Sequence, residues 1–154
     1  MKKLCTILFI LVTGHSFAQQ QSFDNPRNAD EAAIKKLFED EARDFQNVNY
    51  QSYLTHWAKV PYASFLYREG LFVGEALWKK MDEFWQNRKP SDMKLTRKNW
   101  NLRINGNSAF VTYIQHQQSL DTKQESDNYE ERYMEKINGE WKVVNMTVWN
   151  IPGK

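Results

Sequence analysis

The stretch YEERYMEKINGEWKVVNMTVW, residues 129–149, decides the fold. Two runs rich in β-branched and aromatic residues flank the pair Asn138-Gly139, which is the strongest short signal for a two-residue hairpin turn. The sequence therefore predicts two antiparallel strands near the C-terminal end of the chain. Arg132 stands in the middle of the first strand, so the role of this hairpin depends on whether that side chain meets water or a pocket.

The two-residue turn fixes which side chains of the two strands lie opposite each other. Ile137 then pairs with Glu140, and Arg132 pairs with Asn145. The face of Arg132 suits the floor of a pocket, because it combines tryptophan with small polar groups: Glu130, Arg132, Met134, Trp141, Val143, Asn145, Thr147 and Trp149. The opposite face carries charged pairs and an apolar band that favours contact with a partner chain: Tyr133, Val144, Met146 and Val148.

The direction of Arg132 stays open on this pattern alone. A long arginine on a strand commonly reaches water or joins a surface ion pair. A one-residue bulge beside the turn would also exchange the two faces.

Three further strands are predicted upstream of this hairpin. Residues 94–104 and 109–118 alternate with period two around Asn105-Gly106, which predicts a second hairpin. The two hairpins together make a four-stranded antiparallel meander. Residues 62–68, YASFLYR, predict a short strand rich in aromatic residues.

Three helices are predicted before the meander, from apolar residues at helical spacing. Asn28 and Glu31 form the capping-box signal that starts the first helix. The helices cover residues 29–46, a short segment from 50 that ends before Pro61, and a segment from Gly74 that ends at Pro90. We therefore expect an α+β fold in which three N-terminal helices pack on one face of a strongly curved antiparallel sheet.

The first eighteen residues, MKKLCTILFILVTGHSFA, have the pattern of a cleavable secretory signal peptide with cleavage after Ala18. We therefore expect an exported protein, periplasmic or secreted. Residues 19–28 are polar and without periodicity, which predicts a flexible N-terminal segment, and residues 29–151 form the domain. The apolar run of the signal is too short to span a bilayer, and no other stretch approaches about 20 apolar residues.

The composition argues against several classes of protein. Loss of Lys2 and Lys3 with the signal lowers the 21 basic residues to 19, which equals the number of acidic residues. A neutral chain gives no reason to expect nucleic acid or membrane as a partner. Cys5, the one cysteine, also leaves with the signal. His56 and His116 lack metal-ligand spacing, so we expect no metal and no cofactor.

Four segments in this order carry a family resemblance: NVNYQSYLTHW (47–57), EGLFVGEALW (69–78), RINGNSAFVTYIQ (103–115) and NGEWKVVNMTVW (138–149). Residues 29–151 resemble the SnoaL-like branch of the nuclear transport factor 2-like superfamily. The segments AFVTYIQ and YEERYMEKINGEWKVV are also similar to the hub domain of calcium/calmodulin-dependent protein kinases.

The resemblance implies a cystatin-like cone with a pocket inside it, and a homodimer through the outer face of the sheet. In the hub domain an arginine on the penultimate strand lines that pocket, and Arg132 takes this place here, which favours an inward side chain. A second pocket arginine of the hub falls at Gln115. The histidine that many relatives carry on the last strand falls at Asn145 or Thr147. These departures imply that the two-arginine anion clamp and the commonest base are both missing.

We expect the partner to be a small organic ligand with Arg132 as its polar anchor. The candidate ligand-binding residues combine this cation with amide groups and aromatic walls: Arg132, Gln115, Asn145, Tyr113, Trp57, Tyr53, Tyr67 and Trp78. Such a pocket suits a flat or apolar molecule that bears a carboxylate or a carbonyl.

Two other functions stay open. An enzyme of the isomerase, dehydratase or cyclase kind would use His56 or Glu130 as its base. His56 also suits the surface or an interface, and an ion pair with Arg132 is the simpler account of Glu130. A dimeric or oligomeric assembly module similar to the hub would have a filled cone.

Overall fold

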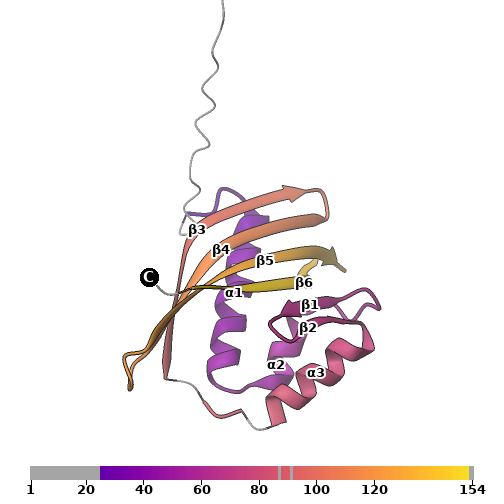
Figure 1. Cartoon of the computed structure of the whole chain (residues 1–154). Coiled ribbons are helices and arrows are strands. Elements are labelled where there is room, and N and C mark those ends of the chain that lie inside the picture. Colours follow the sequence, from indigo (N-terminus) through magenta and orange to yellow (C-terminus); the bar gives the residue numbers. More distant parts are fainter. Residues whose placement is uncertain (1–24, 87, 91, 153–154) are drawn as a thin grey trace, which may run out of the picture.

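A six-stranded sheet arches over one long helix, with a smaller helix and a hairpin closing one end (Figure 1). The computed structural model describes residues 25–86, 88–90 and 92–152. The signal peptide, Cys5 and part of the flexible segment expected at 19–28 lie outside the described residues. Within those residues no helix is long and apolar enough to cross a membrane.

Helix α1 (Ala29–Gln46) has the bounds that the sequence predicts. The side chain of Asn28 caps it by accepting a hydrogen bond from the backbone N–H of Glu31, at 2.9 Å. The carboxylate of Glu31 also binds the backbone N–H and the guanidinium of Arg27, just before the helix begins. Ile34 and Phe38 of the apolar stripe are fully buried, and they pack α1 onto the concave face of the sheet.

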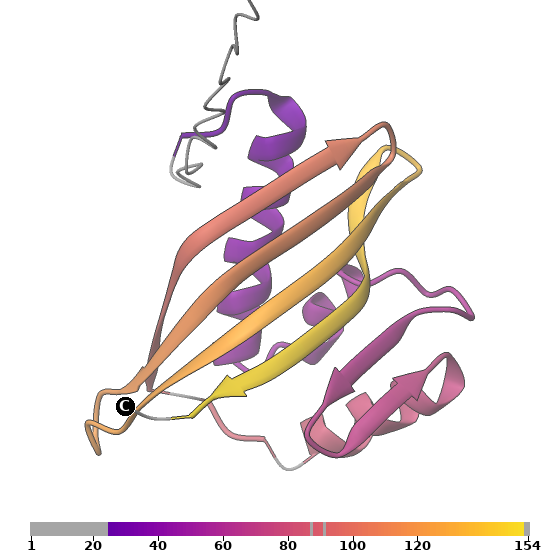
Figure 2. The same ribbon diagram turned by 45° about the horizontal axis from the view of Figure 1, so that its top comes forward.

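Helices α2 (Tyr50–Thr55) and α3 (Glu75–Gln86) are separated by a hairpin that the sequence analysis missed. Strand β1 (Ser64–Tyr67) was expected, but it pairs with the unpredicted strand β2 (Gly70–Val73). Three helices precede the meander in the described residues, but only α1 and α3 are longer than six residues, because α2 ends at Thr55. β1 also runs parallel to β6, so the sheet is not wholly antiparallel. Figure 2 shows the β1–β2 pair beside β6 and close to α3.

The remaining strands form the predicted meander: β3 (Met93–Asn105), β4 (Ser108–Ser119), β5 (Glu125–Ile137) and β6 (Glu140–Ile151). The turn of the first hairpin was placed one residue too early, because Asn105 pairs with Ser108 and the loop is residues 106–107. The turn at Asn138-Gly139 is as predicted, with positive φ at both residues and Ile137 opposite Glu140.

A bulge in β6 changes the register that the turn sets. Met134 pairs with Val143 as expected, but Tyr133 pairs with Asn145, which leaves Val144 without a partner residue. Arg132 is consequently opposite Met146, and the prediction that it faces Asn145 is wrong. Beyond the bulge the predicted faces of β6 are exchanged, so Met146 turns into the cone and Asn145 turns away from it.

Candidate functional site

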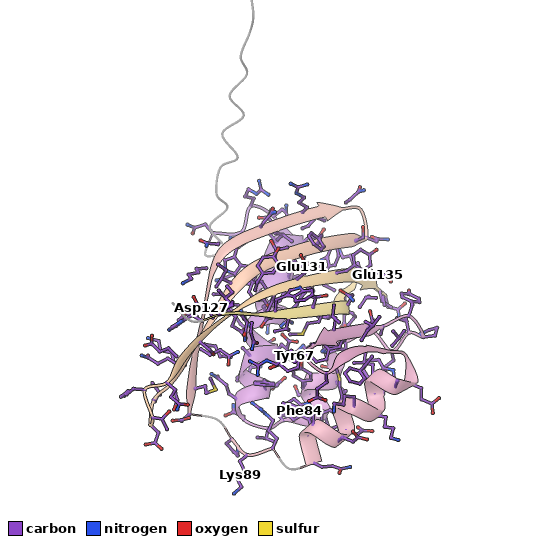
Figure 3. The ribbon with its side chains drawn as sticks, in the orientation of Figure 1. Tyr67, Phe84, Lys89, Asp127, Glu131 and Glu135 are labelled. Atoms are coloured by element: carbon purple, nitrogen blue, oxygen red, sulfur yellow. The ribbon has the colours of Figure 1, made fainter. Side chains whose placement is uncertain are left out.

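The concave side of the sheet encloses a cavity of about 920 Å³ that reaches from α1 to α3. Polar and charged side chains make up much of its wall, and the aromatic side chains in it are Phe45, Tyr53, Trp57, Phe65, Tyr67, Phe72, Phe84 and Trp85. Figure 3 shows Tyr67 and Phe84 in the space between the sheet and α3, with Lys89 beyond the end of the helix. The volume is typical of a site for a small organic molecule, and the aromatic side chains supply an apolar surface on part of the wall.

Arg132 points into the cone, and it is only 3% exposed. Its Nη1 is ion-paired to Glu41 of α1, and its Nη2 donates to Oε2 of Glu130 at 3.1 Å. The guanidinium also lies 4.7 Å from the ring centre of Phe38. Burial opposes its charge, yet the two carboxylates outweigh burial and raise the pKa of Arg132 well above its ordinary value. The inward orientation is confirmed, but two carboxylates already neutralise the positive charge.

Glu130 uses both of its carboxylate oxygens inside this cluster. Oε2 accepts from the hydroxyl of Tyr113 at 2.5 Å as well as from Arg132, and Oε1 accepts from Nε2 of Gln115 at 2.8 Å. Burial is the main reason that the pKa of Tyr113 is raised, so this phenol remains a donor. The ion pair between Glu130 and Arg132 that the sequence favoured is confirmed. A carboxylate held by three donors is poorly suited to the role of a base.

A second arginine, Arg97 of β3, also lies in the cone, directly across from Gln115. Its Nε donates to Oε1 of Gln115 at 3.1 Å, and its Nη1 donates to the carbonyl oxygen of Phe38 at 3.1 Å. The guanidinium lies 5.5 Å from the ring centre of Phe38 and 5.4 Å from that of Tyr113. Arg97 forms no ion pair with any carboxylate that the structure describes. The expectation that a second pocket arginine is missing is therefore wrong, because β3 supplies the cation that β4 lacks.

Three buried polar atoms in the cavity wall have no hydrogen-bond partner among the described residues: Oε1 of Glu41, Nε1 of Trp57 and Nε of Arg132. Burial first, and then the negative charge of Glu41, raise the pKa of Tyr53. The Trp57 indole lies close enough to the hydroxyl of Tyr53 to lower the pKa of this phenol in part, although the two groups miss the geometry of a full hydrogen bond. Buried polar groups in folded proteins are normally paired, so three unpaired atoms in one wall are unusual.

Five of the predicted ligand-binding residues line the cavity: Arg132, Gln115, Tyr53, Trp57 and Tyr67. Tyr113 lies behind them, where it binds Glu130. Trp78 packs edge-on against Trp57, with ring centres 6.4 Å apart, and is not part of the described lining. Asn145 donates instead to the hydroxyl of Ser64 at 2.7 Å, on the side of the sheet away from the cone.

His56 lies outside the described lining of the cavity. Its Nε2 is 2.8 Å from Oδ2 of Asp44, and the same oxygen accepts from the hydroxyl of Ser52 at 2.5 Å. These contacts join α2 to the end of α1. His56 therefore holds two helices together and is not placed to act on a molecule in the cone.

Sequence reasoning missed Glu41 and Arg97, although both carried a signal. Glu41 follows Ile34, Leu37 and Phe38 at helical spacing, so it stands inside the buried apolar stripe. Arg97 follows Met93 and Leu95 with period two, on the inward side of β3. A charged residue on the buried face of either element points to a site.

Comparisons by sequence find no matching family model and no matching curated protein. Solved structures do match. A protein of unknown function with a cystatin-like fold from Nostoc punctiforme has a TM-score of 0.67 and 15% identity over 80% of this chain and 92% of its own. A proposed dehydratase from the NTF2-like family of Streptomyces avermitilis has a TM-score of 0.68 and 10% identity over 84% of this chain and 100% of its own.

The CaMKII hub of S. rosetta is similar as well, with a TM-score of 0.63 and 22% identity over 78% of this chain and 95% of its own. At these identities the likeness concerns the fold. The protein has the cystatin-like fold of NTF2-like proteins.

Proposed function

We propose that the protein binds a small organic carboxylate inside the cone, and that Arg97 anchors the anionic group. The observation that carries this proposal is the contrast between Arg132 and Arg97, the two cavity arginines that lie on strands. Arg68 and Arg88 also line the cavity, from the β1–β2 turn and from beyond the end of α3. Arg132 is ion-paired to two glutamates, whereas Arg97 is held by neutral oxygens and aromatic rings and has no carboxylate partner among the described residues. A guanidinium presents several N–H donors, which match the two oxygens of a carboxylate.

The body of the ligand is apolar or aromatic. Aromatic side chains line the cavity on the side of the β1–β2 hairpin and of α3, where Phe65 and Tyr67 stack with ring centres 5.9 Å apart. A volume of about 920 Å³ lies within the range of sites that enclose drug-sized molecules. These walls supply the hydrophobic contact, and the arginine supplies the orientation.

A thermal-shift screen of the purified protein tests this proposal. The panel pairs aromatic and aliphatic carboxylates with their neutral primary amides. A ligand at 100 times its dissociation constant stabilises the fold by about 2.7 kcal/mol, which raises the melting temperature by several degrees. We expect shifts with carboxylates and not with the amides. Equal shifts for both members of every pair, or no shift at all, would refute an anion site.

We propose in addition that the protein is a homodimer formed through the outer face of the sheet. Four large apolar side chains are exposed there, on strands β4 to β6: Phe110, Tyr133, Trp149 and Ile151. Glu131 and Glu135 lie along the same face of β5 (Figure 3). A group of exposed aromatic residues rimmed by charges is typical of an interface, and the fold neighbours include hub domains. Export stays part of the proposal because residues 1–18 have the pattern of a signal peptide.

A further inference from the structure

Glu41 has one carboxylate oxygen that nothing in the described part of the chain satisfies. The residue is only 2% exposed, and it lines the cavity from α1. Its Oε2 accepts a hydrogen bond from Nη1 of Arg132, while Oε1 accepts none from the described residues. A buried carboxylate oxygen without a donor is costly, because it has lost its hydration and gained no hydrogen bond.

The second helix contributes a donor to the same wall. The indole N–H of Trp57 is buried and has no acceptor within the described ranges. A hydroxyl or an amino group on a ligand would donate to Glu41, and a hydroxyl oxygen would also accept from Trp57. The wall of the cavity therefore offers complementary atoms for one small polar group.

The anchor Arg97 and the unpaired oxygen of Glu41 lie against the same turn of α1. Arg97 donates to the carbonyl oxygen of Phe38, and Glu41 follows three residues later. Three residues advance about 4.5 Å along a helix axis, which is less than one turn. A single small molecule is long enough to meet both groups.

We infer that the ligand is a bifunctional organic acid, which carries an O–H or N–H donor for Oε1 of Glu41 a few ångströms from its carboxylate. This inference rests on the proposed anion site at Arg97 and adds the chemical class of the ligand. It also assigns Glu41 and Trp57 as specificity determinants, with Arg132 and Glu130 holding Glu41 in place.

Matched ligands isolate the contribution of the ligand's hydroxyl donor to the binding affinity. Benzoate, 3-hydroxybenzoate and 3-methoxybenzoate form one set, and phenylacetate with its 4-hydroxy and 4-methoxy derivatives forms another. In calorimetric titrations of the wild-type protein, the hydroxyl compound of at least one set should bind about tenfold more tightly than the unsubstituted and methoxy compounds of that set. This is the gain in affinity that a hydrogen bond to a charged group predicts. Equal affinities within both sets would overturn the inference.

Substitutions of Glu41 and Trp57 test whether these two residues cause the tighter binding of the hydroxyl compound. In Glu41→Met, Arg132 keeps Glu130 as its partner, and we expect the hydroxyl preference to disappear. Trp57→Phe keeps an aromatic ring without the donor and should weaken the preference. Glu39→Met, on the exposed side of α1, serves as the control and should keep it. A preference that survives in both Glu41→Met and Trp57→Phe would contradict the assignment.

Failure of the inference is distinguishable from failure of the anion site. If carboxylates bind and Arg97→Met abolishes their binding, but the hydroxyl gives no advantage, only the assignment of Glu41 is wrong. If no carboxylate binds, the proposed function and the inference both fail.

Discussion

Arg132 of β5 is ion-paired to Glu41 of α1, so a buried charge pair joins the central helix to the sheet it lies against. Glu130 supplies a second carboxylate to the same guanidinium. All three side chains are almost completely buried. The arginine that the sequence singled out is therefore part of the framework of the pocket.

Replacement of Arg132 should consequently damage the fold. Arg132→Met leaves Glu41 and Glu130 buried without their cation, which typically costs about 3 to 5 kcal/mol of unfolding free energy. Urea unfolding followed by circular dichroism measures this change. The triple variant Arg132→Met, Glu41→Gln, Glu130→Gln carries no buried charge at these positions and should recover much of the loss. A single variant as stable as the wild type would show that the pair contributes little.

The start of α3 should tolerate no side chain at Gly74. This residue has a φ of 55°, and a Cβ would lie 2.6 Å from the carbonyl oxygen of Pro61. Gly106 has nearly the same φ, 57°, but open space around its Cβ position. Gly106→Ala should cost about 1 kcal/mol for the left-handed backbone alone, and Gly74→Ala clearly more. If thermal unfolding shows the same loss of stability for both variants, the loop before α3 can move to make room for the added Cβ at little cost.

Acid should weaken the junction of α1 and α2. Burial opposes ionisation of Asp44, but the hydrogen bonds from Ser52 and His56 prevail and hold the pKa of this carboxyl below its ordinary value of 3.8. A lowered carboxyl pKa stabilises the fold above the ordinary value, and the stabilisation is lost as the pH falls through the lowered pKa.

Asp44→Asn tests this junction. At pH 7 the variant should be about 1 kcal/mol less stable than the wild type, and at a pH below the lowered pKa of Asp44 the difference should disappear. Asp121→Asn, in the exposed β4–β5 loop, should show no difference at either pH. A gap between Asp44→Asn and the wild type that is constant with pH would exclude this carboxyl as the source.

The outer face of the sheet should hold the proposed dimer together. Trp149 is 55% exposed and Phe110 is 41% exposed, and a charge at either place cannot be buried against a second copy without a partner. Light scattering should give a dimer for the wild type and a monomer for Trp149→Glu and Phe110→Glu. Leu120→Glu, in the loop after β4, should remain a dimer. A wild-type monomer would contradict the proposal.

The sequence predicted those parts of the fold that depend on local signals. Asn28 and the apolar stripe defined α1, and Asn138-Gly139 defined the last hairpin, because capping and turn geometry depend on a few adjacent residues. The bulge at Val144 had no such signal, since Val143 and Val144 are both buried valines typical of a strand. One extra residue was enough to misplace Asn145.

The candidate site was harder to predict because its charges meet across distant elements. Glu41 and Arg132 are 91 positions apart, and no sequence pattern around either residue predicts that the two form an ion pair. The resemblance pointed to Arg132 correctly, and it could not show that two glutamates surround the guanidinium. Arg97 went unrecognised because it stands between Lys94 and Lys98, and such a basic run gives no local sign that one of its side chains turns into the cone.

The most direct test of the central claim is a calorimetric titration of the tightest carboxylate from the screen into wild-type protein, Arg97→Met and Arg103→Met. Arg103 lies on the same strand and faces outward, so it controls for the loss of a positive charge. We expect Arg103→Met to bind like the wild type and Arg97→Met to bind at least tenfold more weakly, with both variants folded. Undiminished binding by Arg97→Met would contradict the assignment of Arg97 as the anchor.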